Sequence, residues 1–425
     1  ATVVVASIVW PGLDAQETPP VDTTVWALQT GEGTRYARVN TSILELDTVR
    51  TVSDPSQVAQ SSAGTFLFTG SNSRVTRVDE ALPVDLDDEA LRESPATPDG
   101  TVEVVTAGEF VVYRTESGVL YTGTLSEGRT PTRLEPFPSD DEDAPSYAAD
   151  AVALDDRGIL LSFSEGDGSV LTYDIPASSV RSRDVVSIDD PADPAITGAG
   201  DAWVLVDRED GSYLVEGTDA ARPAPVTGAV IASSPDPDGD AVYLASDTGL
   251  ARIPVDGGEP EPVVGDTTLL GTPAQPLVQD GVVHAAWLAE GDLGGQLWTS
   301  ERGTLSPLDY AGQELSDQRR PVFTSNGDTV ILNETRTGWV WTVPDGRLVP
   351  SSQRWSLDDE VVSDAQPSEE QLSVVIDPKA PIAEPDAFGV RPGALVSLPV
   401  LLNDHDPNED VLSVDPASVT GLDPG

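Results

Sequence analysis

The sequence predicts an all-β protein built from small antiparallel sheets. Short apolar runs alternate with turns rich in Gly and Asp, and no long stretch has helical periodicity. The turn before the most hydrophobic strand of each unit recurs eight times, at spacings of 39 to 50 residues, beginning at Asp22, Gly64, Gly108, Gly158, Gly200, Gly239, Gly281 and Gly327. Four strands per unit of about 44 residues indicate a β-propeller of about eight four-stranded blades, with seven as the alternative.

The N-terminal segment begins with an apolar run from Thr2 to Trp10, followed by a Pro-rich stretch. Because the chain has no Met, we expect it to be a fragment of a longer protein. Residues 1–10 are then either the outer end of a transmembrane helix, which needs about 20 residues, or a buried strand of β-branched residues. Residues 11–21 are predicted to be a linker.

Residues 22–350 carry the repeats. In most units a tight turn such as TESG, EGDG or REDG leads into an alternating strand such as VLYTGTL, VLTYDI or SYLVEG, as expected of hairpins. The first unit lacks an opening strand before Val25. We therefore expect a segment after Pro350, or within Gln371–Ile376, to pair there and close the ring, with 351–380 otherwise a linker. Residues 381–425 contain short alternating strands at Ala394–Val400 and Val411–Val414, about half of a sandwich domain.

Composition excludes several functions. A formal net charge of −50 disfavours binding to nucleic acid or to anionic lipid surfaces. The absence of Cys removes disulfides, thiolate nucleophiles and zinc–cysteine sites. His284 lies in the apolar strand VVHAAW and is expected to be a core residue. Acidic runs such as Asp85 to Glu89 are expected in solvated loops, and the strand tryptophans mostly in the core.

Motifs for catalysis are missing: the sequence has no G-x-S-x-G, H-E-x-x-H, P-loop or dinucleotide-binding fingerprint. Glycosidase chemistry needs only two carboxylates, so a propeller hydrolase or lyase acting on cell-wall polysaccharide stays as the alternative function. Such an enzyme would need converging carboxylates and an aromatic platform at one mouth of the channel.

The blade from Ser234 to Val263 resembles the blades of TolB-like and WD40-like bacterial propellers, which implies the fold and not the ligand. The segment V-L-L-N-D-H-D-P from Val400, with Asp410 and Leu412, resembles the opening of bacterial Ig-like and cadherin-like repeats, some of which bind calcium. That resemblance implies Asn403, Asp404, Asp406 and Asp410 as calcium ligands, with Asp386 less secure. The alternative is an Asx-rich turn held by its own side chains.

The whole arrangement resembles large surface proteins of high-GC Gram-positive bacteria, in which a propeller precedes tandem Ig-like repeats. This resemblance implies a non-enzymatic, extracellular interaction or adhesion scaffold, held in the membrane only by an N-terminal anchor. The expected partner is a protein or cell-wall glycan, and no cofactor is expected apart from calcium. A TolB-like adaptor with a partner at the central channel is a third hypothesis.

Overall fold

The computed structural model describes residues 24–355, except 32, 62, 126–129, 138–146, 187, 189–190, 227, 233, 266–267, 291–293, 317 and 328, together with 382, 383 and 385. The chain divides into two compact units, 1–359 and 360–425. The predicted membrane segment 1–10, the linker 11–21, the ring-closing strand 371–376 and the four calcium ligands lie outside the described residues and stay predictions. No helix in the described part of the chain is long and apolar enough to cross a membrane.

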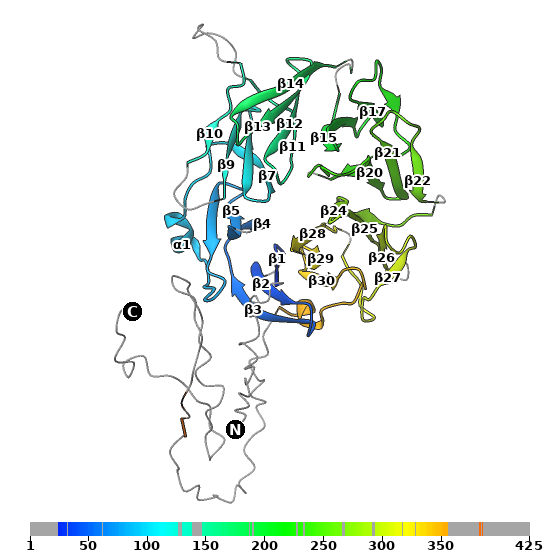
Figure 1. The fold of residues 1–425 in the computed structure, drawn as a ribbon. Helices are drawn as coiled ribbons and strands as arrows, with labels where there is room; N and C mark the ends of the chain where they lie inside the picture. Colours follow the sequence, from blue (N-terminus) through cyan, green and yellow to red (C-terminus); the bar gives the residue numbers. More distant parts are fainter. Residues whose placement is uncertain are drawn as a thin grey trace, which may run out of the picture. The chain divides into compact units, whose positions relative to one another are not determined.

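Eight small sheets stand in a ring around a central channel, so the predicted all-β, eight-bladed propeller is confirmed (Figure 1). Blades 1 to 4 comprise β1 (Val25–Gln29), β2 (Arg35–Asn40) and β3 (Glu45–Thr51); β4 (Pro55–Ser61), β5 (Gly64–Thr69) and β6 (Arg74–Val78); β7 (Thr101–Ala107), β8 (Phe110–Thr115), β9 (Leu120–Thr124) and β10 (Thr132–Arg133); and β11 (Ala151–Leu154), β12 (Ile159–Ser164), β13 (Ser169–Asp174) and β14 (Ser179–Val185).

Blades 5 to 8 follow the same plan. They comprise β15 (Pro194–Ala199), β16 (Ala202–Asp207), β17 (Ser212–Val215) and β18 (Arg222–Pro223); β19 (Val230–Ile231), β20 (Ala241–Ser246), β21 (Gly249–Pro254) and β22 (Glu261–Val264); β23 (Thr272–Pro273), β24 (Leu277–Gln279), β25 (Val282–Leu288), β26 (Gly295–Thr299) and β27 (Ser306–Leu308); and β28 (Pro321–Asn326), β29 (Thr329–Glu334) and β30 (Trp339–Thr342). A short helix, α1 (Asp88–Glu93), follows β6 in blade 2, and a 3-10 helix, η2 (Pro350–Gln353), follows blade 8.

Within each blade the strands pair antiparallel and mostly in sequence order, from the channel outward. Blades 2 and 8 have three strands, and a single bridge stands at the fourth position of each, Arg74 with Ala96 and Trp341 with Leu348. Blade 1 differs, because β1 aligns with the second strand of the other blades. The described residues therefore give blade 1 no inner strand of its own.

The core lies between neighbouring blades, where the two faces of adjacent sheets meet. Trp26, Trp287 and Trp341 are fully buried, and the other strand tryptophans, Trp203, Trp298 and Trp339, are nearly so. All of them pack within clusters of Val, Leu and Ala from adjacent strands. Since a single twisted sheet cannot bury both of its faces, this packing is what stabilises each blade.

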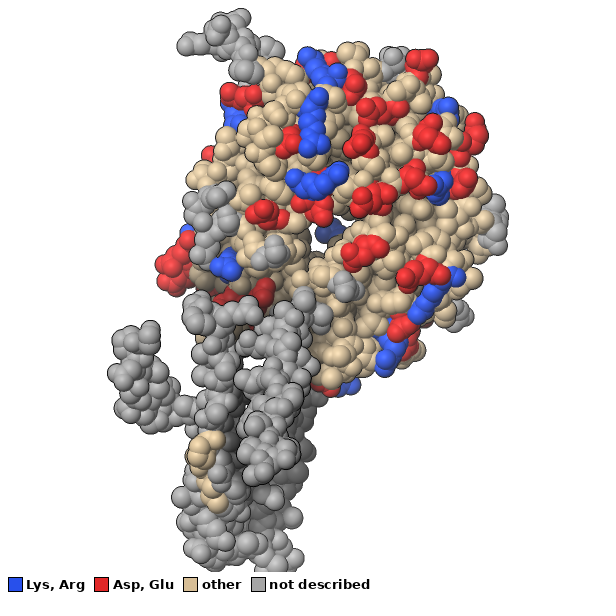
Figure 2. All heavy atoms as spheres, viewed as in Figure 1, with Lys and Arg blue, Asp and Glu red and all other residues tan. Residues whose placement is uncertain are grey.

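Acidic side chains lie mostly in turns and loops, and several have structural roles there. Figure 2 shows them spread over the visible face of the ring, interspersed with basic side chains. In the predicted acidic run, Asp87 accepts hydrogen bonds from the N–H groups of Glu89 and Ala90 and so caps α1. Asp85 accepts the Thr51 N–H at 2.8 Å, and this hydrogen bond holds the pKa of its carboxyl below the usual range.

The ring closes where blade 8 meets blade 1. Thr30 N–H donates to the Thr335 carbonyl at 2.7 Å, and Gly31 N–H donates to the Arg336 carbonyl at 2.9 Å. The segment 350–355 then covers the outer part of this junction. Ser351 Oγ accepts the Leu46 N–H from β3, while Ser352 Oγ accepts the Val340 N–H from β30. We call residues 350–355 the clasp.

Candidate functional site

A cavity of about 580 Å³ lies at blade 1, against the inner strands of the ring. The residues that open the inner strands of blades 2, 3 and 8 meet the turns after β1, β5 and β29 at this end of the ring. The lining accordingly comes from several blades and includes Thr30, Asp54, Gln57, Asn72, Thr101, Val102, Arg320, Val322, Thr324 and Thr335. This volume is in the range of small-ligand sites. We call this space the channel cavity.

The channel cavity lies beside blade 1, for which the described residues give no inner strand. Two N–H groups on the inner edge of β1 nevertheless have side-chain partners. Trp26 N–H donates to Gln60 Oε1 at 2.7 Å, and Leu28 N–H donates to Asn333 Oδ1 at 2.8 Å. Two side-chain amides thus stand where the carbonyls of a neighbouring strand would be, which protects the edge from adventitious pairing. At these two positions the cavity therefore presents side chains to a ligand, because the main-chain N–H groups are already bonded.

The blade 8 wall carries a positive charge beside a buried carboxylate. Glu334, at the end of β29, is 1% exposed. Its Oε1 accepts the N–H groups of Arg320 (2.9 Å) and Arg336 (3.2 Å). Its Oε2 accepts the N–H and Oγ1 of Thr337. These donors occupy the carboxylate, which therefore fixes the backbone of Arg320 and does not pair with its guanidinium. The guanidinium has no ion-pair partner among the described residues.

The blade 2 wall combines unusual backbone conformation with an unsatisfied acceptor. Asp54, Ser71 and Asn72 have φ values of 45°, 53° and 68°, the left-handed region that non-glycine residues seldom adopt. Gly70 N–H donates to the Asp54 carbonyl, and Asn72 N–H donates to Ser56 Oγ, which holds the two loops together. Asn72 Oδ1 is buried and has no hydrogen-bond partner in the described part of the chain. Strained residues and an orphan acceptor are features that functional sites concentrate.

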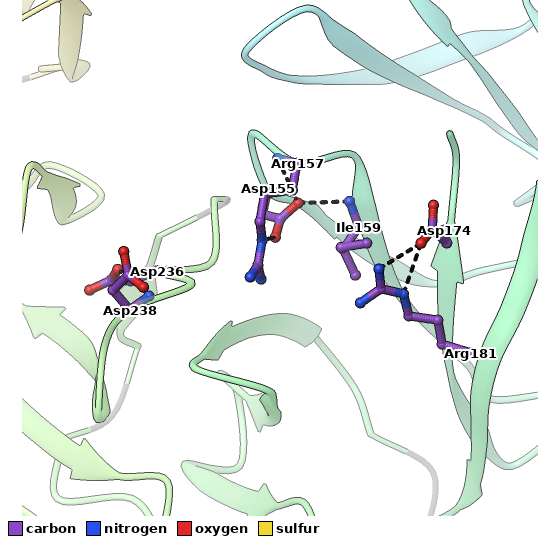
Figure 3. A network of polar contacts seen from close by, with 7 residues as sticks. All are labelled: Asp155, Arg157, Ile159, Asp174, Arg181, Asp236 and Asp238. Carbon is purple, nitrogen blue, oxygen red and sulfur yellow. Dashed lines mark hydrogen bonds and ion pairs between the residues drawn. The ribbon is translucent and has the colours of Figure 1, made fainter. Parts of the chain in front are cut away.

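Other carboxylates are engaged within their own hairpins and do not converge. Asp155 is buried and accepts the N–H groups of Arg157 and Ile159, while Asp174 accepts the guanidinium of Arg181 (Figure 3). In Figure 3, Asp236 and Asp238 lie together on a separate loop, apart from Asp155. These groups stabilise turns. Among the described residues, no three His, Cys, Asp or Glu side chains are placed to hold a metal ion.

One carboxyl has the raised pKa expected of a general acid. Burial, followed by the nearby Asp184 and Asp201 charges, raises the pKa of Glu216, although the Trp203 N–H that it accepts opposes the shift. Glu216 follows β17 in blade 5 and is not among the described residues that line the channel cavity. It therefore does not supply an acid to that site.

His284 is a core residue, as its strand context predicts. It is 7% exposed in β25, its ring lies 6.2 Å from that of Phe323, and Nδ1 has no partner among the described residues. Burial lowers the pKa of His284 from 6.5 to about 4. The folded state therefore keeps the imidazole neutral.

We expect His284 to make the protein acid-sensitive. Between pH 6.5 and 4 the unfolded chain binds a proton at His284 that the folded chain does not. The free energy of unfolding is therefore at its full value, as far as His284 decides it, above pH 6.5 and decreases as the pH falls toward 4. A difference of this size corresponds to about 3 kcal/mol. Urea unfolding of the wild type and of His284→Leu at pH 7, 5.5 and 4 measures it. If both proteins lose stability equally over this range, His284 is not the cause.

Sequence patterns did not single out the residues of the channel cavity. Arg320, Asn72 and Gln57 carry no motif, and Arg320 is one of 22 arginines. The available signal was positional: each lies beside or at the start of an inner strand, or in a turn after a second strand, and in a propeller these positions meet at one end of the channel.

Comparison with known proteins finds distant likenesses among solved structures. No family model and no curated protein matches the chain. A solved streptogramin B lyase is similar at 14% identity and a TM-score of 0.43, covering 68% of this chain and 92% of that one. A protein from Lactobacillus plantarum is similar at 14% identity (TM-score 0.42; 68% and 95% covered), and the designed protein Ika8 at 15% (TM-score 0.43; 70% and 86%). These likenesses are too distant to carry an argument about function.

Proposed function

We propose that this chain is a non-enzymatic interaction protein of the cell surface, in which the propeller is the binding head and the channel cavity its ligand site. The composition of the lining is the observation that carries the proposal. Hydroxyl and amide side chains such as Gln57, Thr101, Thr324 and Thr335 surround one cation, Arg320, and one carboxylate, Asp54. Such a lining binds through hydrogen bonds and a single charge.

An enzyme acting by acid–base catalysis on a glycosidic bond would need a second carboxyl group opposite the first. Asp54 is the one carboxylate among the described lining residues, and Glu216 belongs to blade 5. The hydrolase or lyase alternative therefore has less support than binding. In the proposal, the N-terminal segment anchors the chain in a membrane, and the segment from 381 begins an Ig-like spacer outside the cell.

The proposal predicts retention on a wall polymer without product release. Purified wall sacculi of a high-GC Gram-positive bacterium present glycan and peptide together. We expect the full chain to co-sediment with them and to release no reducing ends. Val102 is a half-exposed residue of the inner strand β7. Val102→Trp should therefore fill the cavity and reduce retention about tenfold or more.

Val185→Trp is the matched control, because Val185 is 85% exposed on the outer strand β14. It adds the same side chain away from the channel and should bind like the wild type. Release of reducing ends would favour the enzyme. Absence of retention, or retention indifferent to Val102→Trp, would contradict the proposed binding site.

A further inference from the structure

We infer that the channel cavity recognises a short extended peptide that carries a carboxylate, with Arg320 as the residue that binds the carboxylate. The inference rests on the proposed function and names its ligand class. It combines three features of the cavity: a cation without an ion-pair partner among the described residues, two half-exposed apolar side chains on inner strands, and several hydroxyl and amide side chains.

The charge comes first. At physiological ionic strength, charges interact over about 8 Å, so the acidic outer surface is largely screened from the channel. Within the channel cavity the described lining carries one cation, Arg320, and one carboxylate, Asp54, so the local charge balance is even although the whole chain carries −50. Glu334 is saturated by four donors, which leaves the Arg320 guanidinium able to form a charge-assisted hydrogen bond with an anion.

The walls favour a peptide over a sugar. Val102 on β7 and Val322 on β28 are 49% and 46% exposed, although both belong to inner strands. Successive side chains of an extended peptide point to opposite sides, so two apolar residues of a peptide match two apolar contacts on the walls. No aromatic ring is present among the described lining residues to stack on a sugar.

The polar side chains of the walls suit a peptide backbone, because Gln57, Thr101, Thr324 and Thr335 line the channel cavity and can donate and accept hydrogen bonds. Since Gln60 and Asn333 already accept the Trp26 and Leu28 N–H groups, the peptide contacts side chains and does not add a strand to β1.

A carboxylate can come from a C-terminus or from an Asp side chain, and four probes separate the sources. The probes are Ac-Thr-Val-Thr-Val with a free C-terminal carboxylate, the same peptide as a C-terminal amide, Ac-Thr-Asp-Thr-Val amide, and a tetrasaccharide of alternating glucuronate and N-acetylglucosamine. Isothermal titration of each into the full chain gives the dissociation constant.

We expect one or both of the carboxylate peptides to bind, and the uncharged amide to bind about tenfold or more weakly. Arg320→Gln removes the charge and keeps hydrogen-bonding groups, so it should abolish the preference for the acid over the amide. Arg302→Gln changes net charge equally at a rim residue paired with Asp345, and it should leave that preference intact. Thermal melts check that both variants fold.

Four results would overturn the inference: neither carboxylate peptide binding more tightly than the uncharged amide, an unchanged preference in Arg320→Gln, binding of the tetrasaccharide alone, or binding of no probe. If no probe binds but sacculi are still retained in a manner sensitive to Val102→Trp, the ligand class is wrong while the proposed binding site stands. If retention also fails, the proposed function itself is wrong.

Discussion

Replacing Trp355 with Ala is expected to lower the free energy of unfolding by about 3 to 5 kcal/mol and to open the ring between blades 8 and 1. Truncating a buried Trp generally costs this much, because the cavity left behind relaxes only in part. Trp355 is 1% exposed and packs with residues of both blades, including Val25, Ile331 and Val340. It is thus part of the core that joins the first blade to the last.

The geometry around Trp355 leaves little room for compensation. Its indole N–H donates to the Gly338 carbonyl at 2.8 Å, and its own φ is 46°. A Cβ placed on Gly338, whose φ is +87°, would lie 2.0 Å from the indole nitrogen. The clasp therefore requires Gly at 338 and Trp at 355. Gly338→Ala should destabilise the same junction as Trp355→Ala.

Urea unfolding gives the free energy, and hydrogen exchange shows where the ring opens. In Trp355→Ala, exchange should accelerate selectively in β1, β29 and β30. Trp203→Ala removes the same kind of side chain from the junction of blades 4 and 5, where the chain is continuous, and should destabilise without accelerating exchange at blades 8 and 1. Equal protection of β1 in wild type and Trp355→Ala would show that the clasp does not close the ring.

The repeat architecture could be predicted because it depends on local signals. Gly and Asp at turns and alternating apolar residues in strands recur with a regular period, and the buried tryptophans follow from their place in those strands. The contacts that position the channel cavity are of another kind. Glu334 and Asp207 look like two of the 73 acidic residues in a turn-rich chain.

Both carboxylates are in fact buried at the end of a second strand, where each accepts hydrogen bonds from its own turn and from the segment entering the same blade. That arrangement depends on residues about 14 positions apart meeting in space, which no local pattern specifies. Similarly, an opening strand missing from blade 1 was visible in the sequence. The cavity beside it, with Arg320 and Asn72 on its walls, required the ring to be assembled.

Glu334→Ala is expected to destabilise the protein by about 3 to 5 kcal/mol and to weaken binding at the channel cavity. The substitution leaves the part-buried N–H groups of Arg320, Arg336 and Thr337 without their acceptor, and each such group costs about 1 to 3 kcal/mol where water cannot replace the partner. Because Glu334 fixes the backbone of Arg320, its removal should also loosen the guanidinium.

Asp207→Ala is the matched control in blade 5. Asp207 is 2% exposed, ends β16 as Glu334 ends β29, and accepts the N–H groups of Ala192, Asp193, Glu209 and Asp210. It should lose comparable stability, measured by urea unfolding, yet bind the acid peptide like the wild type at a temperature where both variants are folded. Glu334→Gln keeps one carbonyl acceptor and should fall between Glu334→Ala and the wild type in both measurements.

Measurements of stability and of binding distinguish the two roles of Glu334, which are to hold the turn at the end of β29 and to position Arg320. Loss of stability in both alanine variants, with loss of binding only in Glu334→Ala, identifies Glu334 as the residue that positions Arg320. If Asp207→Ala weakens binding as much as Glu334→Ala does, the effect on binding comes from general loosening of the ring and Glu334 has no particular connection to the channel cavity. If neither variant is destabilised, the turn hydrogen bonds are replaced by water, and the buried carboxylates do not hold the blades at this end of the ring.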